Sequence, residues 1–280
     1  MILCENIVKI YKSGESKTLA LQGLDLHVKK GEMLAVMGAS GSGKSTLLNI
    51  IGCLEKADAG SLLIDGTDAS KMTFQQINDF RTNKIGFVWQ NNARNLIPHL
   101  SAFENVLAPM RIIGKADKRR AMELLKTVGL EHRIQNTLFE LSGGEQQRVA
   151  IAVALANDPS IILADEPTGS VDTATCDELM RLFRKINTEY NKTIVIVTHD
   201  THLSSMVDRV VYIRDGKTSS ELMRTREGNH IHQTHDEYSV IDKYGRLQIP
   251  KHILEKAEIS NMVTFEVKEK GCIVIKDKKQ

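Results

Sequence analysis

The chain has 280 residues, of which 41% are hydrophobic and 26% are charged, and its formal net charge is +2. No stretch approaches the ~20 apolar residues that span a bilayer, so we expect a soluble chain with one main domain and one smaller domain rather than a membrane protein. The first residues lack the order of a signal peptide and the four cysteines show no pairing or metal-ligand spacing, so we expect a cytoplasmic location.

A glycine-rich segment, residues 37–50, reads MGASGSGKSTLLNI and lies between a predicted buried strand and a predicted helix. Gly38, Gly43, Lys44 and Ser45 form the pattern G-x-x-x-x-G-K-[ST]. Glycines let successive backbone N–H groups curve around phosphate oxygens, and the helix N-terminus adds partial positive charge. Lys44 can then neutralise the β- and γ-phosphates, and the Ser45 hydroxyl can coordinate Mg²⁺. The predicted ATP-binding residues of this segment are Gly38, Ser40, Gly41, Gly43, Lys44, Ser45 and Thr46.

Further along the chain, residues 141–156 read LSGGEQQRVAIAVALA and predict a helix that follows a serine and two glycines. Ser142, Gly143 and Gly144 therefore form a second helix start of the kind that binds phosphate. Because one such helix start suffices for one nucleotide, the second must serve another nucleotide or the nucleotide of another chain.

Two acidic residues, Asp165 and Glu166, follow the aliphatic residues of SIILADEPTG. An isolated Asp-Glu pair usually lies in a solvated turn, but this one ends a predicted buried strand, which favours a position at the carboxyl edge of a parallel sheet. There Asp165 can hold Mg²⁺ and Glu166 can polarise the attacking water.

Taken together, these motifs resemble those of the ATP-binding cassette (ABC) ATPases, and LSGGEQQ is similar to the signature motif of that family. In ABC ATPases, the signature residues of one subunit close over the γ-phosphate held by the phosphate loop of its partner. The chain has one phosphate loop, one signature and no internal repeat, so the resemblance implies a head-to-tail homodimer. The residues expected to act on the partner's nucleotide are Ser142, Gly143, Gly144 and Glu145.

The resemblance also implies roles for four residues outside these motifs. Tyr11 matches the aromatic residue that stacks on adenine, and Gln90 matches the glutamine that contacts Mg²⁺ and water. Asp172 matches an acidic residue at the dimer interface, and His199 matches the histidine that contacts the γ-phosphate. The expected catalytic residues are Glu166, His199 and Gln90, and the expected Mg²⁺ ligands are Ser45, Gln90 and Asp165.

The resemblance covers residues 1–217 and is most specific for the MacB-, LolD- and FtsE-like branch, whose members often couple ATP hydrolysis to movement of a membrane partner. It implies an α/β P-loop NTPase of ABC type, with a mixed sheet and a helical signature subdomain at about residues 91–158. We expect an ATP-hydrolysing subunit that drives a separate permease at the inner face of the cell membrane. Export, lipid or lipoprotein extraction, peptide resistance and mechanical signalling all remain open.

Residues 218–237 are polar and almost free of aliphatic side chains, which predicts a linker between domains. This segment contains His230 and His232, with His235 nearby. Their spacing is not that of a standard metal site and no cysteine is close, so we expect a solvated linker and no metal.

The C-terminal residues 238–280 predict a strand reaching Pro250, a short helix and a hairpin that turns at KEKG. The segment DKYGRLQIP resembles the AbrB/SpoVT swapped-hairpin family, whose dimers intertwine and often bind DNA. Residues 236–280 contain nine Lys or Arg and eight Asp or Glu. That balance falls short of the basic surface of a duplex-binding protein, so we expect dimerisation or regulation instead.

The positions where that family presents arginines support the same expectation. Arg246 is present, whereas Ser239, Leu254 and Glu255 occupy the other positions. The alternative is a soluble ABC ATPase or a regulator that binds DNA through this C-terminal domain.

Overall fold

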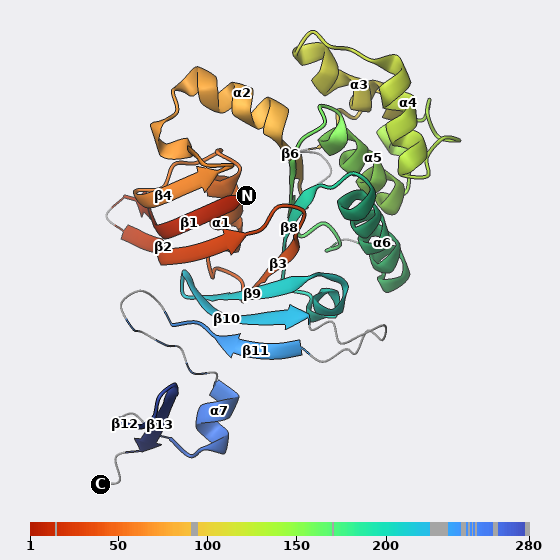
Figure 1. The fold of residues 1–280 in the computed structure, drawn as a ribbon. Coiled ribbons are helices and arrows are strands. Elements are labelled where there is room, and N and C mark those ends of the chain that lie inside the picture. The colour runs from red at the N-terminus through yellow and green to blue at the C-terminus, as the bar shows by residue number, and fades with distance from the viewer. Residues whose placement is uncertain are drawn as a thin grey trace.

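The computed structural model describes residues 1–14, 16–90, 95–169, 171–224, 235–241, 245, 247, 249, 251–259 and 263–277. A seven-stranded mixed sheet lies between a smaller antiparallel sheet and a group of helices, and a short helix and a hairpin follow near the C-terminus (Figure 1). The predicted α/β class with a mixed sheet is confirmed.

The central sheet has the strand order β11-β10-β9-β3-β8-β7-β6. Most side chains of its parallel strands are aliphatic and buried, because the sheet is covered on both faces. The loops that follow β3, β7 and β8 leave the same edge of the sheet, which brings their residues together. The parallel strands are β3 (Met33–Met37), β6 (Ile85–Val88), β7 (Ile161–Asp165), β8 (Thr193–Thr198) and β9 (Arg209–Arg214).

Two further strands of this sheet correct the predicted linker at residues 218–237. Strand β10 (Lys217–Arg224) pairs antiparallel with β9, and β11 (His235–Ser239) pairs antiparallel with β10. Their sequences are polar because β11 is the edge strand of the sheet and most side chains of β10, which lies between β9 and β11, are only partly buried. Leu222 is an exception and packs against the core. The sheet of the main domain therefore continues to Ser239. Of the three histidines considered for a metal site, His230 and His232 lie outside the described residues.

One face of the central sheet packs against helix α1 (Lys44–Ile51) and the antiparallel sheet β2-β1-β4-β5. Leu47, Leu48 and Ile51 of α1 are fully buried and belong to the same hydrophobic cluster as Leu34 and Val36 of β3. This packing fixes the helix directly after the glycine-rich loop. The strands of the smaller sheet are β1 (Ile2–Ser13), β2 (Ser16–Val28), β4 (Ala59–Ile64) and β5 (Thr67–Asp68).

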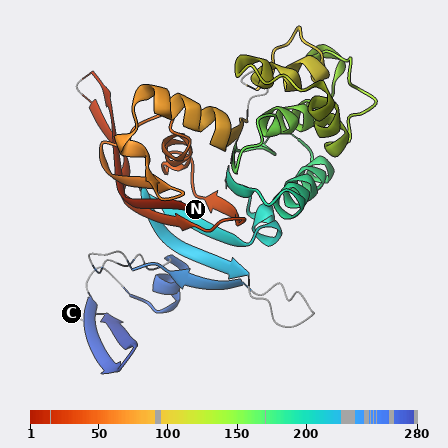
Figure 2. The same ribbon diagram turned by 45° about the horizontal axis from the view of Figure 1, so that its top comes forward.

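The other face is covered by α5 (Gly143–Leu155) and α6 (Thr173–Glu189), and α3 (Ala102–Ile112) and α4 (Lys118–Thr127) pack on α5 (Figure 2). Helices α3 to α5 lie within the predicted helical subdomain at residues 91–158. Helix α2 (Phe74–Lys84) buries none of its residues. The short 3-10 turns are η1 (Ala69–Lys71), η3 (Leu138–Glu140) and η4 (Thr201–Met206).

Near the C-terminus, helix α7 (Lys251–Lys256) precedes a hairpin of β12 (Val263–Glu269) and β13 (Cys272–Asp277). The predicted helix and hairpin are confirmed. The strand predicted before Pro250 is reduced, among the described residues, to an isolated bridge between Ile241 and Leu247, and Arg246 lies outside those residues.

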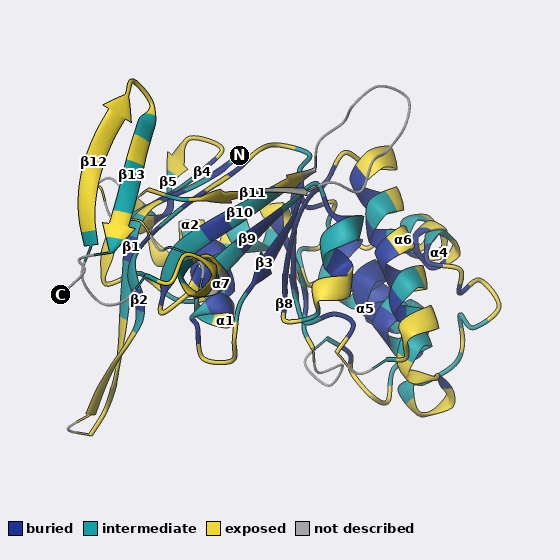
Figure 3. Ribbon diagram, turned by 90° about the horizontal axis from the view of Figure 1, so that it is seen from below, coloured by how far each residue is buried: buried dark blue, intermediate teal, exposed yellow. Residues whose placement is uncertain are grey.

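Strand β12 of this hairpin is mostly exposed and β13 is partly exposed (Figure 3). Phe265 pairs across the strands with Ile275, and Val267 pairs with Ile273, so these side chains share a face. Phe265, Val267 and Ile273 are 68%, 74% and 61% exposed. Two strands alone bury too little surface to be stable. An exposed apolar face on such a hairpin therefore suggests a surface that another chain covers.

Candidate functional site

The loop between β3 and α1 packs so closely on neighbouring backbone that two of its positions require glycine. A Cβ atom at Gly38 would lie 2.3 Å from the carbonyl oxygen of Ile213 at the end of β9. Gly43 has a φ of 101°, and a Cβ atom there would lie 2.5 Å from the carbonyl oxygen of Ala20 in β2. Any side chain at either position would push the loop away from the strands that hold it.

The start of α1 leaves backbone N–H groups for a ligand, because its N-cap residue Gly43 has no side chain to accept their hydrogen bonds. Beside them the buried Lys44 donates from Nζ to the carbonyl oxygens of Gly38 and Ala39, at 2.9 Å each. The buried Ser42 hydroxyl has no hydrogen-bond partner among the described residues. This cradle of N–H groups and one ammonium fits phosphate oxygens.

Acidic and polar side chains gather where β7 and β8 end. The Ser45 hydroxyl donates to Oδ1 of Asp165 at 3.2 Å, so the start of α1 and the end of β7 meet. Next to Asp165, Glu166 accepts a hydrogen bond on Oε2 from Nε2 of Gln90 at 3.4 Å. Its Oε1 lies 2.9 Å from Nδ1 of His199. Because a carboxylate only accepts hydrogen bonds, Nδ1 of His199 carries the proton in this contact.

Tyr11 in β1 is held in place by a residue that the sequence analysis missed. Its hydroxyl donates to Oε2 of Glu55 at 2.7 Å and lies 3.4 Å from Oγ1 of Thr46. Burial raises the pKa of the Tyr11 phenol, which therefore stays neutral. Glu55 lies in a polar turn after α1, and no pattern in the sequence distinguishes it from a solvated carboxylate.

These groups line one cavity of about 370 Å³. The structure therefore brings together the phosphate loop, the predicted adenine-stacking residue, Glu166 and His199, which lie far apart in the sequence. The lining residues are Tyr11, Thr18, Leu19, Ala20, Ser40, Gly41, Gly43, Lys44, Ser45, Thr46, Glu166 and His199.

The predicted signature residues at the start of α5 do not line this cavity. The Ser142 hydroxyl accepts from the backbone N–H of Glu145 at 3.3 Å, and the Glu145 carboxylate accepts from the backbone N–H of Ser142 at 2.8 Å. That second hydrogen bond is the main cause of the lowered pKa of Glu145. Nothing described lies within 4 Å of a Cβ atom built at Gly143, so no contact in this chain explains a glycine there.

Asp172 caps α6 close to this segment. It accepts from the backbone N–H of Thr175 at 3.0 Å and from the Thr175 hydroxyl at 2.8 Å, and the backbone hydrogen bond lowers the pKa of Asp172. A Cβ atom at Gly144 would lie 2.8 Å from Cγ2 of Thr175. The start of the signature helix and the start of α6 are therefore neighbours.

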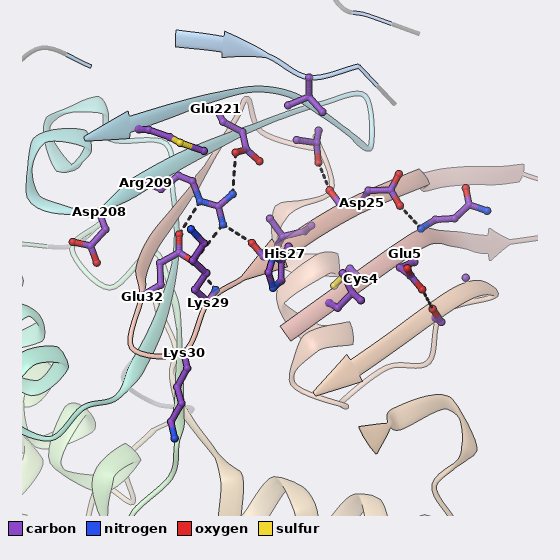
Figure 4. A pocket seen from close by; sticks show the side chains of 18 of the residues that line it. Cys4, Glu5, Asp25, His27, Lys29, Lys30, Glu32, Asp208, Arg209 and Glu221 are labelled. Atoms are coloured by element: carbon purple, nitrogen blue, oxygen red, sulfur yellow. Dashed lines mark hydrogen bonds and ion pairs between the residues drawn. The ribbon is translucent and has the colours of Figure 1, made fainter. Parts of the chain in front are cut away.

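A second, larger cavity of about 1410 Å³ lies between the antiparallel sheet and β10 (Figure 4). Charged side chains that line it form ion pairs with one another. Arg209 donates to Glu32 at 2.7 Å, to Glu221 at 3.0 Å and to the carbonyl oxygen of His27. Because the guanidinium is already neutralised by two carboxylates, these groups tie β9 to β10 and to the start of β3 rather than presenting a charge to a ligand.

The family model for ABC transporters matches residues 21–169, which is more than half of the chain. The chain belongs to the ABC transporter family. This cassette is 46% identical over 228 residues to the ABC transporter ATP-binding protein MJ0796 of Methanocaldococcus jannaschii, covering 79% of this chain and 96% of the relative. It is 41% identical over 234 residues to the lipoprotein-releasing system ATP-binding protein LolD of Pseudoalteromonas translucida, covering 82% of this chain and 98% of the relative.

A third curated relative is the macrolide export ATP-binding/permease protein MacB of Syntrophobacter fumaroxidans. The ABC cassette is 44% identical to it over 226 residues, which are 79% of this chain and 31% of the relative. The fold matches the dimeric structure of MJ0796 in a post-hydrolysis state bound to ADP and phosphate, with a TM-score of 0.73 and 44% identity over 80% of this chain and 98% of that chain.

The ABC chain is thus the ATP-binding subunit of a transporter and an ATPase that uses ATP with Mg²⁺. None of the helices in the described part of the chain combines the length and apolarity needed to cross a bilayer. MJ0796 and LolD are matched over nearly their whole length, so about a fifth of this ABC chain has no counterpart in them.

Proposed function

We propose that two copies of this ABC ATPase hydrolyse ATP as a head-to-tail dimer that drives a separate membrane permease. The observation that carries the proposal is the separation of two phosphate-binding elements on one chain. The loop before α1 opens into the nucleotide cavity, whereas Ser142 and Gly143 contribute nothing to it. The dimeric structure of MJ0796 supports a dimer, and the lipoprotein-releasing and macrolide-export relatives support a permease partner.

In this proposal, some residues of the chain bind ATP and others act on the attacking water. Lys44 and the N–H groups at the start of α1 bind the β- and γ-phosphates, and Tyr11 stacks on adenine. The Glu166 carboxylate accepts a hydrogen bond from the attacking water and increases its nucleophilicity. His199 donates from Nδ1 to Glu166, which holds the carboxylate in one orientation.

Ser45, Asp165 and Gln90 are the residues that would hold Mg²⁺, which neutralises phosphate charge when bound. The 3.2 Å contact between Ser45 and Asp165 brings two of these oxygen donors together, as a hard cation requires.

Gly143 supports action on the partner's nucleotide. Gly143 is exposed at the first position of α5, where the backbone N–H group has no partner within the helix and is available to another molecule. With Asp172 nearby at the start of α6, this surface would face the phosphate loop of the second chain. The permease would in turn hold the dimer at the inner face of the membrane.

The test is the compactness of the Glu166→Gln variant with Mg-ATP. In small-angle X-ray scattering, ATP should close a dimer that already exists, or convert monomers into a closed dimer, because closed sites are stabilised by bound ATP and are not reopened by hydrolysis. In the same background, Gly143→Asp should prevent ATP-dependent closure while the affinity of the single chain for ATP stays unchanged. An ATP-independent state in Glu166→Gln would contradict the head-to-tail site.

We also propose that the C-terminal unit, residues 238–280, joins two chains through an AbrB/SpoVT-like swapped hairpin. The exposed Phe265, Val267 and Ile273 support this proposal, because an uncovered apolar face of two strands gains stability when a second copy covers it. Such a joint would keep the two cassettes close together after ATP hydrolysis, since rebinding becomes intramolecular.

Sedimentation without nucleotide distinguishes this joint from closure by ATP. The full chain should sediment as a dimer, and Val267→Lys should make it monomeric because a charge would be buried at the joint. Thr264→Lys places the same charge on the opposite hairpin face and should leave the dimer intact. A monomeric wild type without ATP, or a dimeric Val267→Lys, would rule the joint out.

A further inference from the structure

Phe139 is an aromatic side chain that the fold holds outward without covering it. It lies in the middle of η3 (Leu138–Glu140), three residues before Ser142, and is 83% exposed. The neighbouring Leu138, in contrast, packs against the hydrophobic core. Single exposed aromatic side chains are common on protein surfaces, and Phe139 is distinguished by its position three residues before the predicted signature serine, Ser142.

The turn that carries Phe139 is rigid. The Glu140 carboxylate accepts from the backbone N–H of Thr137 at 2.7 Å and from its hydroxyl at 2.8 Å. From the following helix, Nε2 of Gln146 donates to the carbonyl oxygens of Leu138 and Leu141 at 2.9 and 3.0 Å. The backbone that carries Phe139 is therefore held at a fixed distance from the start of α5, as a preorganised contact requires.

One end of the nucleotide cavity is also exposed in the single chain. Tyr11 and Leu19 line the part of the cavity formed by the antiparallel sheet, and they are 38% and 44% exposed. Tyr11 offers one aromatic face, and Glu55 fixes its hydroxyl. Among the described residues, the other aromatic ring that lines this cavity is His199, which lies beside Glu166, and no second Tyr, Phe or Trp lines it, so the opposite side of a bound base stays open within one chain.

We propose that Phe139 of one chain packs on the adenine of the ATP bound to its partner, on the side that Tyr11 leaves open. The inference rests on the head-to-tail dimer proposed above. With Ser142 over the γ-phosphate, a residue three positions earlier lies within about 10 Å along the chain. That reach lets the ring cover the base end of an extended nucleotide while the signature covers the phosphate end.

The experiment compares two exposed phenylalanines in the full-length Glu166→Gln chain. The ATP concentration that half-saturates ATP-dependent closure is measured as the fall in radius of gyration in small-angle X-ray scattering, because a chain already joined through its C-terminal unit does not change mass on closure. ATP affinity is measured separately on Gly143→Asp, in which closure is prevented. Phe139→Ala should raise the half-saturating concentration at least tenfold, because aromatic stacking on a base is lost in both sites of the dimer. Phe74→Ala, at the equally exposed Phe74 on α2, should have no effect, and Phe139→Trp should restore closure.

A second readout separates contact with the base from contact with protein alone. If Phe139 stacks on the base, closure of the parent chain prefers ATP to UTP because a purine offers more stacking area, and Phe139→Ala reduces that preference. Equal weakening with ATP and UTP would overturn the base contact. If Phe139→Ala and Phe74→Ala had the same half-saturating ATP concentration, the inference would be overturned, but the proposed dimer would not be contradicted. Failure of the parent chain to respond to ATP at all would instead contradict the proposed function.

Discussion

Glu166→Gln is expected to lower ATP turnover by about 100-fold or more while leaving ATP binding intact. Glutamine has the same shape and can keep the hydrogen bond from Nδ1 of His199, but it lacks the negative charge that draws a proton from the attacking water. Steady-state phosphate release and equilibrium binding of a fluorescent ATP analogue measure the two quantities on the same preparation.

Glu178→Gln is the matched control for this prediction. Glu178 lies on α6 and forms an exposed ion pair with Arg148, far from the groups that line the cavity. Its substitution should leave turnover near the wild-type value. If Glu166→Gln retained wild-type turnover, another group would have to accept the proton of the water.

Lys44→Ala is expected to weaken ATP binding itself, by on the order of 100-fold, because it removes the only ammonium among the residues that line the described cavity. The chain should still fold, since Lys44 is paired only with the carbonyl oxygens of its own loop and leaves no buried carboxylate behind. Isothermal titration with Mg-ATP measures the loss, and a thermal melt without nucleotide checks the fold.

Lys30→Ala removes an equivalent charge beside the larger cavity and serves as the control. It should bind ATP like the wild type. Unchanged ATP affinity in Lys44→Ala would mean that the loop does not bind the triphosphate through this ammonium.

The sequence predicted that several residues of the nucleotide site lie together, because they follow buried strands. Aliphatic runs such as β7 and β8 can lie only inside the sheet, and their polar ends then meet at one edge. Asp165 could therefore be placed from its neighbours, whereas the role expected of His199 came from the resemblance to ABC ATPases. Glu55 could not be placed in either way, because its role depends on the fold bringing β1 beside the turn after α1.

The predicted linker at residues 218–237 was wrong for a related reason. A strand such as β10, which lies between β9 and the edge strand β11, needs few apolar side chains, since much of its stability comes from backbone hydrogen bonds to both neighbours. Composition alone cannot distinguish such a strand from a solvated segment. The apolar face of the C-terminal hairpin likewise could not be predicted from composition, because it depends on the strand register that places Phe265 and Val267 on one side.

The pairing of β3 also has a consequence for the order of folding during synthesis. Its two neighbours are β8 and β9, so Met33 pairs with Ile194 and Leu34 pairs with Arg209. A residue still later in the sequence holds the glycine-rich loop, because the backbone N–H of Gly216 donates to the carbonyl oxygen of Ser42. At roughly 5–20 residues per second, the ribosome adds these partners on the order of ten seconds after β3. Throughout that interval β3 is an unpaired aliphatic strand, and the nascent chain cannot form a complete ATP site until nearly the whole cassette has emerged.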